Sequence, residues 1–288
     1  MSKSTIESVG SFLAQVKRIT EQWDNVICSN NEICEEDKPT MKYFFRGHGN
    51  SSWKLRPSLF RPPPVIDEKL CDFEPDKYSY FRQEQFLIQE AIRLYPSSFS
   101  CAKTDIERMT ICQHHALPTR LLDVSGNALV ALYFAVSGEQ NSDGVVYVFR
   151  ASAEDYNIAS TAGSLDEIKI SRYHSGGKGP IAKRQHPILV FPPHETMRQK
   201  AQDGSFYLFE NGITPFSLNE FKNGDFQTIV IPNGEKPKIK EELEATCNIH
   251  KGTLFPESLD GYVEKLKEEA GMRIKAEGCI RFFKGESK

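Results

Sequence analysis

An arginine placed directly after an apolar aromatic run is the residue of this chain best suited to chemistry. The run at residues 43–45 precedes Arg46, and Gly47 and Gly49 follow it. The run predicts a buried strand, so the charge is expected at the mouth of a core. Arginine grips phosphate or carboxylate with paired hydrogen bonds, and the glycines are expected to let the backbone approach the bound group. Arg46 is therefore a candidate phosphate ligand, or else the partner of a buried carboxylate.

A second polar cluster lies directly before a predicted helix. It contains Gln113, His114, His115, Thr119, Arg120 and Asp123. Such crowding before a rigid element is typical of a site built on a scaffold. Adjacent histidines on a helix point about 100° apart, which argues against one shared metal ion. The alternative for Arg120 and Asp123 is that they only pair with each other.

A third stretch combines Arg198 with Gln202, four residues apart on one predicted helix face. Gly204 is expected to end this helix before a strand begins. Gln202 would then lie at a helix-to-strand junction, which is a common place for a functional side chain. The alternative is that Gln202 only caps the helix.

His48, between two glycines, is a candidate general base or a hydrogen-bonded loop residue. The seven cysteines have no paired spacing and no setting typical of a protease nucleophile, so we expect reduced thiols. The acidic residues at 72, 74 and 76 lack the ligand pattern of a calcium site. No metal is therefore predicted.

Composition sets broader limits on function. The 288 residues are 39% hydrophobic and 26% charged, which is ordinary for a globular protein. A net charge of -3 argues against holding nucleic acid by bulk electrostatics, although a local basic groove stays open. No apolar run approaches the ~18 residues of a membrane span, and the N-terminus has no signal-peptide core. We therefore expect a cytoplasmic protein without a membrane partner.

Apolar periodicity predicts mainly helices in the first half of the chain and mainly short strands in the second. Helices are expected at 5–24, where Ser4 and Glu7 form a capping box, around 81–95, 106–116 and 129–136, and at 238–247 and 257–270. Strands are expected to end at Arg46 and to span 145–149, 188–191, 205–209 and 226–231. Loops are expected at 29–40, 61–75 and 150–186. The order indicates an α+β fold, with a helical N-terminal part packed on small mixed or antiparallel sheets.

Taken together, the three stretches resemble the FRG domain, a bacterial family named for a phenylalanine-arginine-glycine motif. The matching residues are Phe45-Arg46-Gly47, the block from Gln113 to Asp123 with the helix behind it, and Arg198, Gln202, Gly204 and Phe206. The resemblance implies an FRG domain at 40–268, an N-terminal helix and acidic loop at 1–39, and an extension at 269–288. The chain departs from the family at Val124, often tryptophan, and at His48, often glutamine.

A second resemblance is to the ADP-ribosyltransferases, and it implies both a fold and a cofactor. In that superfamily an arginine after an aromatic strand holds the phosphates of NAD. The resemblance implies that Arg46 and Gly47 hold the pyrophosphate, and that Gln113, Thr119, Arg120, Asp123 and Arg198 line the rest of the cofactor site. His48 or His114 would accept a proton. Gln202 stands where the superfamily carries a catalytic glutamate, so either Gln202 orients the substrate or Glu195 or Glu210 supplies the charge.

Three functions remain open from the sequence, besides a purely structural or interaction role. The first is an NAD-consuming transferase of the kind used as a toxin or in phage defence, with an antitoxin or another macromolecular acceptor as partner. The second is a module that binds a nucleotide or another phosphorylated ligand without reaction. The third is a nuclease-type toxin, although the chain lacks a clustered carboxylate metal site.

Overall fold

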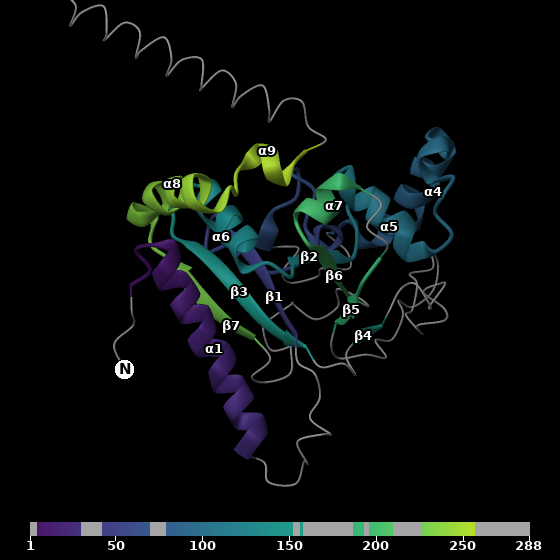
Figure 1. Cartoon of the computed structure of the whole chain (residues 1–288). Helices are drawn as coiled ribbons and strands as arrows, with labels where there is room; N and C mark the ends of the chain where they lie inside the picture. The colour runs from purple at the N-terminus through teal and green to yellow at the C-terminus, as the bar shows by residue number, and fades with distance from the viewer. Residues whose placement is uncertain are drawn as a thin grey trace, which may run out of the picture.

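The computed structural model describes residues 5–29, 42–69, 79–151, 156–157, 187–192, 196–209 and 226–256 (Figure 1). Its helices are α1 (Val9–Ser29), α4 (Glu84–Leu94), α5 (Asp105–His114), α6 (Ala128–Ser137), α7 (Met197–Ala201), α8 (Lys236–Cys247) and α9 (Lys251–Leu254). Short 3-10 turns are η2 (Ser58–Phe60), η3 (Tyr80–Gln83), η4 (Pro96–Phe99) and η7 (Asn233–Glu235). The strands are β1 (Lys42–His48), β2 (Leu121–Ser125), β3 (Gly144–Ala151), β4 (Tyr156–Asn157), β5 (Ile188–Val190), β6 (Gly204–Leu208) and β7 (Phe226–Ile231).

The described strands form one seven-stranded sheet in the order β4-β5-β6-β2-β1-β3-β7. All neighbouring pairs are antiparallel except β4 and β5. The predicted α+β class is confirmed, with one mixed sheet in the described part of the chain in place of several small ones. Figure 1 shows α8, α6, α9, α7, α5 and α4 following one another along the sheet, with α1 beside β3 and β7.

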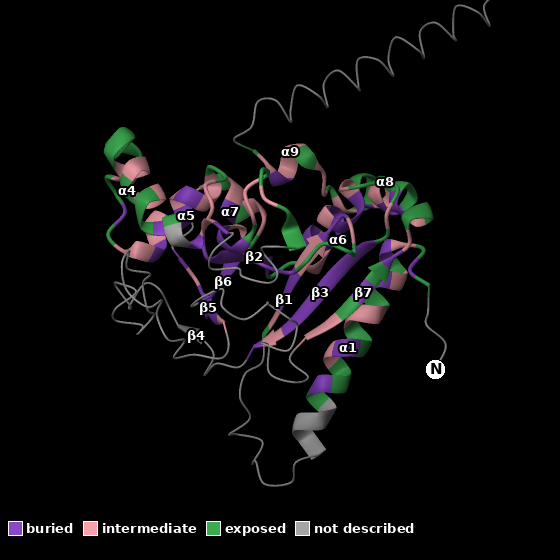
Figure 2. Cartoon of the chain, turned by 180° about the vertical axis from the view of Figure 1, so that it is seen from behind, coloured by how far each residue is buried: buried purple, intermediate pink, exposed green. Residues whose placement is uncertain are grey.

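Alternation along β1 divides the core between the two faces of the sheet. Phe45 packs with α1, α6 and α8, whereas Phe44 packs with η2 and with residues of β2, β3 and β6. Because side chains two apart in a strand share a face, Arg46 lies on the face of Phe44. The central strands are buried, and exposed residues lie on the outer sides of α1, α4 and α8 (Figure 2). Arg46 thus follows strand residues that are buried on both faces of the sheet.

Helix α1 begins at Val9, four residues later than the predicted start. Ser8 and Ser11 exchange hydrogen bonds at this end, because the Oγ of each accepts the backbone N–H of the other. The backbone N–H of Val9 donates to a Glu242 carboxylate oxygen of α8 at 2.8 Å, which places a negative charge at the positive end of α1. Ser4, half of the predicted capping box, lies outside the described residues.

Gly47 is needed for packing between β1 and α6, a role that was not predicted from the sequence. A Cβ atom at this position would lie 1.9 Å from the Ala131 carbonyl oxygen and 2.8 Å from the Ala135 nitrogen. The glycine therefore lets a helix approach the strand, on the face opposite Arg46.

Lys236, at the start of α8, ties the end of β1 to the end of α6. The residue has no exposed surface, and its Nζ donates to the carbonyl oxygens of Gly49 (2.6 Å) and Glu139. Burial lowers the pKa of its ammonium group, while the charges of Asp143 and Glu139 oppose that effect. The contact fixes the loop after β1 relative to two helices.

Most described elements agree with the sequence predictions, and β2 is the main exception. The strands expected at 145–149, 188–191, 205–209 and 226–231 and the helices expected around 81–95, 106–116, 129–136 and 238–247 are confirmed, with shifted ends. β2 was not predicted, because exposed Asp123 interrupts its buried residues and the segment then resembles a polar cluster before a helix. The helix expected at 257–270 lies outside the described residues, as do the loop at 30–40 and nearly all of 152–186. Every helix in the described part of the chain is too short or too polar to cross a membrane.

Replacing Gly47 by alanine should destabilise the protein strongly, because the new methyl group overlaps a backbone oxygen that cannot move independently. We expect the free energy of unfolding in urea to fall by about 3 kcal/mol or more. Gly234→Ala is the matched control, since nothing lies within 4 Å of its added Cβ. Equal stability of the two variants would contradict this account of the β1–α6 contact.

Candidate functional site

The candidate site forms where β1 and β2 part. β1 pairs with β3 at seven positions but with β2 only at Phe45 opposite Ser125. Beyond that pair the register of the two strands is not continued, and the side chain of Arg46 reaches across to the Asp123 carbonyl. Its Nη1 donates to the Asp123 carbonyl oxygen at 2.6 Å and lies 3.4 Å from the carboxylate Oδ2. The arginine therefore joins two strands that the backbone ladder leaves separate.

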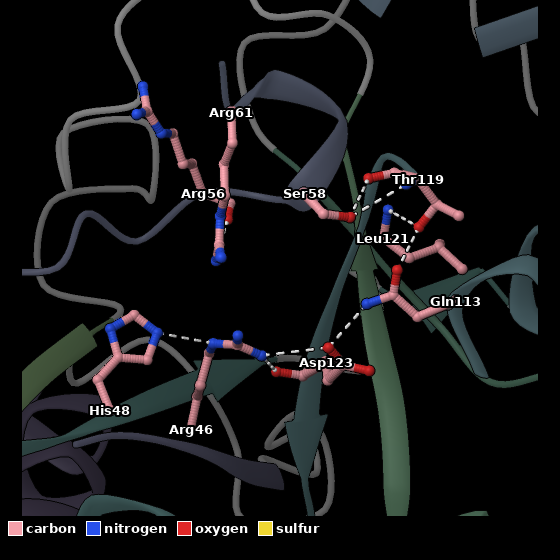
Figure 3. Close-up of polar contacts among 9 residues, drawn as sticks. All are labelled: Arg46, His48, Arg56, Ser58, Arg61, Gln113, Thr119, Leu121 and Asp123. Carbon is pink, nitrogen blue, oxygen red and sulfur yellow. Dashed lines mark hydrogen bonds and ion pairs between the residues drawn. The ribbon is translucent and has the colours of Figure 1, made fainter. Parts of the chain in front are cut away.

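Arg46 is fixed on its other side by His48 (Figure 3). Arg46 Nε donates to His48 Nε2 at 3.0 Å, so the imidazole accepts and is neutral. Arg46 Nη2 has no hydrogen bond to the described residues, and Figure 3 shows Arg61 extending toward Arg46 across an open space. The guanidinium is thus oriented by two contacts while one of its nitrogens remains available.

A chain of side-chain hydrogen bonds orients the Asp123 carboxylate. Gln113 Nε2 donates to Asp123 Oδ2 at 2.8 Å, and Thr119 Oγ1 donates to Gln113 Oε1 at 2.6 Å. The backbone N–H of Thr119 donates to Ser58 Oγ at 3.1 Å, which extends the chain to η2. The Asp123 side chain is still 54% exposed. This carboxylate is therefore positioned by its neighbours and yet open to a ligand.

His48 cannot serve readily as the proton acceptor proposed from the sequence. Its loss of hydration on burial, together with the nearby charges of Arg46 and Arg61, lowers the pKa of His48 from 6.5 to about 3. Its accepting nitrogen is also occupied by Arg46. The structure makes His48 a positioning residue for Arg46 and a very weak base.

Two hollows meet at Arg46. The inner hollow has a volume of about 190 Å³ and lies among β1, β2, β6 and the helices α5, α6 and α7. Its lining includes Phe45, Arg46, Gln113, His114, Asp123, Ser125, Phe134, Arg198, Gln202 and Phe206. The basic hollow has a volume of about 970 Å³ and is lined by Arg46, Gly47, His48, Gly49, Ser52, Trp53, Lys54, Arg56, Arg61, Pro62, Glu68, Tyr133, Phe134, Ser137, Gly138, Lys240, Lys251 and Phe255. Arg46, Gly47 and Phe134 belong to both.

Arg61 in the basic hollow is held among other cations. Its Nη2 donates to the Arg56 carbonyl oxygen at 3.2 Å, and it has no ion pair with a described residue. Partial loss of hydration and the charges of Arg46 and Arg56 lower its pKa, against the opposing effect of Asp123 and Glu68. Arg56 itself pairs with Glu68 at 2.6 Å. An anion between Arg46 and Arg61 would relieve their mutual repulsion.

Arg120 lies outside both hollows, contrary to its predicted role in cofactor binding. It is fully buried, its Nε donates to Glu84 Oε1 at 2.6 Å, and its Nη2 also pairs with that carboxylate. Its guanidinium further packs on the Phe81 ring at 5.7 Å. The suggested Arg120–Asp123 pair is also absent from the described contacts, because Asp123 pairs with Arg46. Arg120 therefore holds α4 to the sheet.

Gln202 and Arg198 line the inner hollow but also fasten the C-terminal part of the described chain. Gln202 is the C-cap residue of α7, and its Nε2 donates to the Leu254 carbonyl oxygen of α9 at 3.0 Å. The Arg198 guanidinium lies 4.8 Å from the centre of the Phe255 ring. Their side chains thus connect the inner hollow to a wall of the basic hollow, where Phe255 lies.

The other predicted residues either line a hollow, lie behind its lining, or fall outside the described residues. His114 lines the inner hollow at the end of α5, with its ring edge against His115 at 5.0 Å. Thr119 acts through Gln113 and does not line either hollow. Glu195 and Glu210, the alternative carboxylates, lie outside the described residues. Within the described ranges, no three His, Cys, Asp or Glu side chains are grouped to hold a metal ion.

The basic hollow was not predicted from the sequence as a binding site. Its cations come from β1, from the residues directly before and after η2, and from α8 and α9, so no single stretch displays them. The repeated arginines at 46, 56 and 61 were the available signal, since a strand followed by two more arginines concentrates positive charge in a short segment.

Comparison with known proteins identifies one region of the chain. The model of the FRG domain matches residues 41–144, from β1 to the start of β3, so this region is an FRG domain. No curated protein and no solved structure matches the chain. The match confirms the FRG resemblance and lends no support to the ADP-ribosyltransferase resemblance. The predicted limits at 40 and 268 stay a prediction, since the match ends before α7 and β6.

The low pKa of His48 predicts a specific dependence of stability on pH. Between pH 6.5 and about 3 the unfolded chain holds the His48 proton and the folded chain does not. This contribution is therefore complete above pH 6.5 and is lost as pH falls, by up to about 1.4 kcal/mol per unit. We expect wild type to lose about 2 kcal/mol more than His48→Gln between pH 7 and 5 in urea denaturation. Parallel losses in the two proteins would contradict the buried, neutral imidazole.

The buried pair predicts that Glu84→Gln is strongly destabilising, because it leaves the Arg120 charge without its carboxylate. We expect unfolding in urea to show a loss of about 3–5 kcal/mol. Glu90→Gln is the matched control, since Glu90 is also on α4 and pairs with an arginine, Arg93, at the surface. The control should show no measurable change. Similar stability of the two variants would return Arg120 to the list of candidate site residues.

Proposed function

We propose that this FRG domain protein binds a phosphorylated nucleotide across its two hollows, that the nucleotide is NAD, and that the protein breaks its nicotinamide–ribose bond. The observation that carries the proposal is Arg46, a guanidinium fixed by two contacts at the junction of a basic and a largely apolar hollow. A dinucleotide has the same polarity, with phosphates in the middle and a flat heterocycle at its end.

The diphosphate would lie between Arg46 and Arg61. Arg46 presents Nη2 to this space, and Arg61 approaches it from the other wall (Figure 3). Guanidinium groups match phosphate oxygens in geometry and charge, and two facing cations favour a doubly charged group. The orientation of Arg46 by His48 and Asp123 reduces the entropy that the arginine loses on binding.

The nicotinamide would occupy the inner hollow. Its volume of about 190 Å³ suits one small heterocycle, and Phe45, Phe134 and Phe206 give it apolar walls. Asp123 is the sole carboxylate among the described residues that line it, and Gln113 holds that carboxylate in place. A fixed negative charge at this position would stabilise the positive charge that develops on the ribose as the bond breaks.

The reaction follows from this placement. The bond between C1′ of the ribose and the pyridinium nitrogen breaks, and its electron pair stays on the nitrogen, which gives neutral nicotinamide. An oxygen or nitrogen of an acceptor, or of water, then forms a bond to C1′ and releases its proton. Gln202 would orient the ribose through its amide. Consumption of NAD in the cytoplasm would suit a toxin or a phage-defence effector.

A second candidate is a module that binds the nucleotide without reaction. Two points favour it: the ADP-ribosyltransferase resemblance implies an amide, from Gln202, in place of a catalytic glutamate, and burial lowers the pKa of His48 to about 3, which makes it a weak base. Both functions share the site at Arg46, and only release of nicotinamide distinguishes them.

The test is a thermal-shift titration with NAD and ADP-ribose, followed by assay of free nicotinamide. NAD should stabilise wild type, and Arg46→Ala should weaken binding at least about tenfold because a charge-assisted contact is lost. Arg46→Lys should lose nearly as much, because lysine cannot bridge Asp123 and a phosphate together. Arg108→Ala on α5, away from both hollows, is the matched control and should bind as wild type does.

Asp123→Asn separates catalysis from binding in the same assay. It should keep NAD binding and release nicotinamide about 100-fold more slowly. Because the Asp123 side chain is half exposed, its stability loss should stay below about 1 kcal/mol, not the larger loss of a buried pair. Binding without nicotinamide from wild type would select the second candidate. No shift with either ligand would remove both.

A further inference from the structure

We propose that the outer part of the basic hollow binds single-stranded nucleic acid, and that this strand is the acceptor of the transferred group. The role of the strand as acceptor rests on the proposed function, whereas binding of the strand to the protein can be tested by itself. It concerns residues that the nucleotide site at Arg46 and Arg61 does not use.

The lining of the basic hollow has a strong excess of positive charge. The described lining of the basic hollow carries six cationic side chains, from Arg46, Lys54, Arg56, Arg61, Lys240 and Lys251, against one carboxylate, from Glu68. The whole chain has a net charge of -3, so positive charge is concentrated here against the overall balance. A cleft lined by one sign of charge focuses the field and attracts a ligand of the opposite sign. A single diphosphate would face only two of these cations.

The basic hollow is also large, and its cations come from distant parts of the chain. The basic hollow, at about 970 Å³, is at the upper end of volumes that enclose one small ligand. Lys240 on α8 and Lys251 on α9 approach it from the C-terminal part of the described chain, whereas Lys54 belongs to the segment after β1. Cations from several parts of the chain suit an extended polyanion better than a second isolated phosphate.

Trp53 adds an exposed aromatic ring to the basic hollow, a feature independent of its charge. It lines the basic hollow beside Lys54, and 50% of its surface is exposed, so one face of the ring is open to a ligand. Its ring is tilted against that of His48, with the centroids 6.3 Å apart. An exposed aromatic ring within a cationic groove is the arrangement by which proteins stack single-stranded bases. An acidic protein would use the lysines but would have no use for the ring.

The chemistry requires no further reactant. A nitrogen or oxygen atom of the strand forms the bond to C1′ of the ribose and loses its proton to solvent. The nicotinamide leaves with the electron pair of the broken bond. Because Arg46 belongs to both hollows, a strand in the basic hollow lies next to the bond that breaks.

The test is fluorescence anisotropy of the full chain with a labelled 12-nucleotide single strand of mixed sequence, as RNA and as DNA. We expect wild type to bind at least one of them. Replacing both Lys240 and Lys251 by glutamine should reduce the salt slope of the binding constant by about 1.4, at about 0.7 for each phosphate contact. Trp53→Ala should weaken binding about tenfold through lost stacking.

Lys238→Gln is the matched control. Lys238 and Lys240 lie on the same helix, each has a glutamate 3.9 Å away, and only Lys240 lines the hollow. The control should bind as wild type does. No binding at 50 mM salt, equal binding by all variants, or equally tight binding of polyglutamate would overturn the inference. A NAD titration of wild type is run in parallel, so failure with oligonucleotides and failure with NAD are separate results.

Discussion

The structure depends on how one positive charge is kept in the middle of a sheet. Arg46 belongs to a central strand, yet β1 and β2 are joined at only one position beside it. Its guanidinium fills that gap by donating to the Asp123 carbonyl, and the neutral imidazole of His48 accepts from its other side. The Arg46 side chain is only 18% exposed, so these partners replace hydrogen bonds to water that its guanidinium has lost. The same contacts leave one nitrogen of Arg46 directed at the hollows.

The surrounding fold makes this arrangement rigid. The absence of a side chain at Gly47 brings α6 onto the back of β1, and Lys236 fastens the loop after β1 from α8. Gln202 ties α7 to α9 through Leu254, so both hollows share walls that are linked to one another. Binding energy can then be spent on the ligand instead of on ordering the site.

The sequence indicated the residues around Arg46, including His48, Gln113 and Asp123, but not the contacts that other elements make with them. The aromatic run before Arg46 and the apolar periodicity of residues 129–136 predicted β1 and α6, because local pattern determines such elements. β2 was missed, since alternation with an exposed aspartate in five residues resembles a turn. The partner of Arg120 could not be predicted, because Glu84 lies 36 residues away and only the tertiary fold brings the two together. The basic hollow required Lys240 and Lys251, which no local pattern connects to Arg46.

A crystal structure of the protein with ADP-ribose would test the central claim most directly. The account predicts the diphosphate between the guanidinium groups of Arg46 and Arg61, with the terminal ribose directed toward Asp123 and the inner hollow left for nicotinamide. Phosphate density elsewhere on the protein, or Arg46 still bonded only to His48 and Asp123 with the ligand bound away from it, would contradict the claim that this arginine holds the nucleotide.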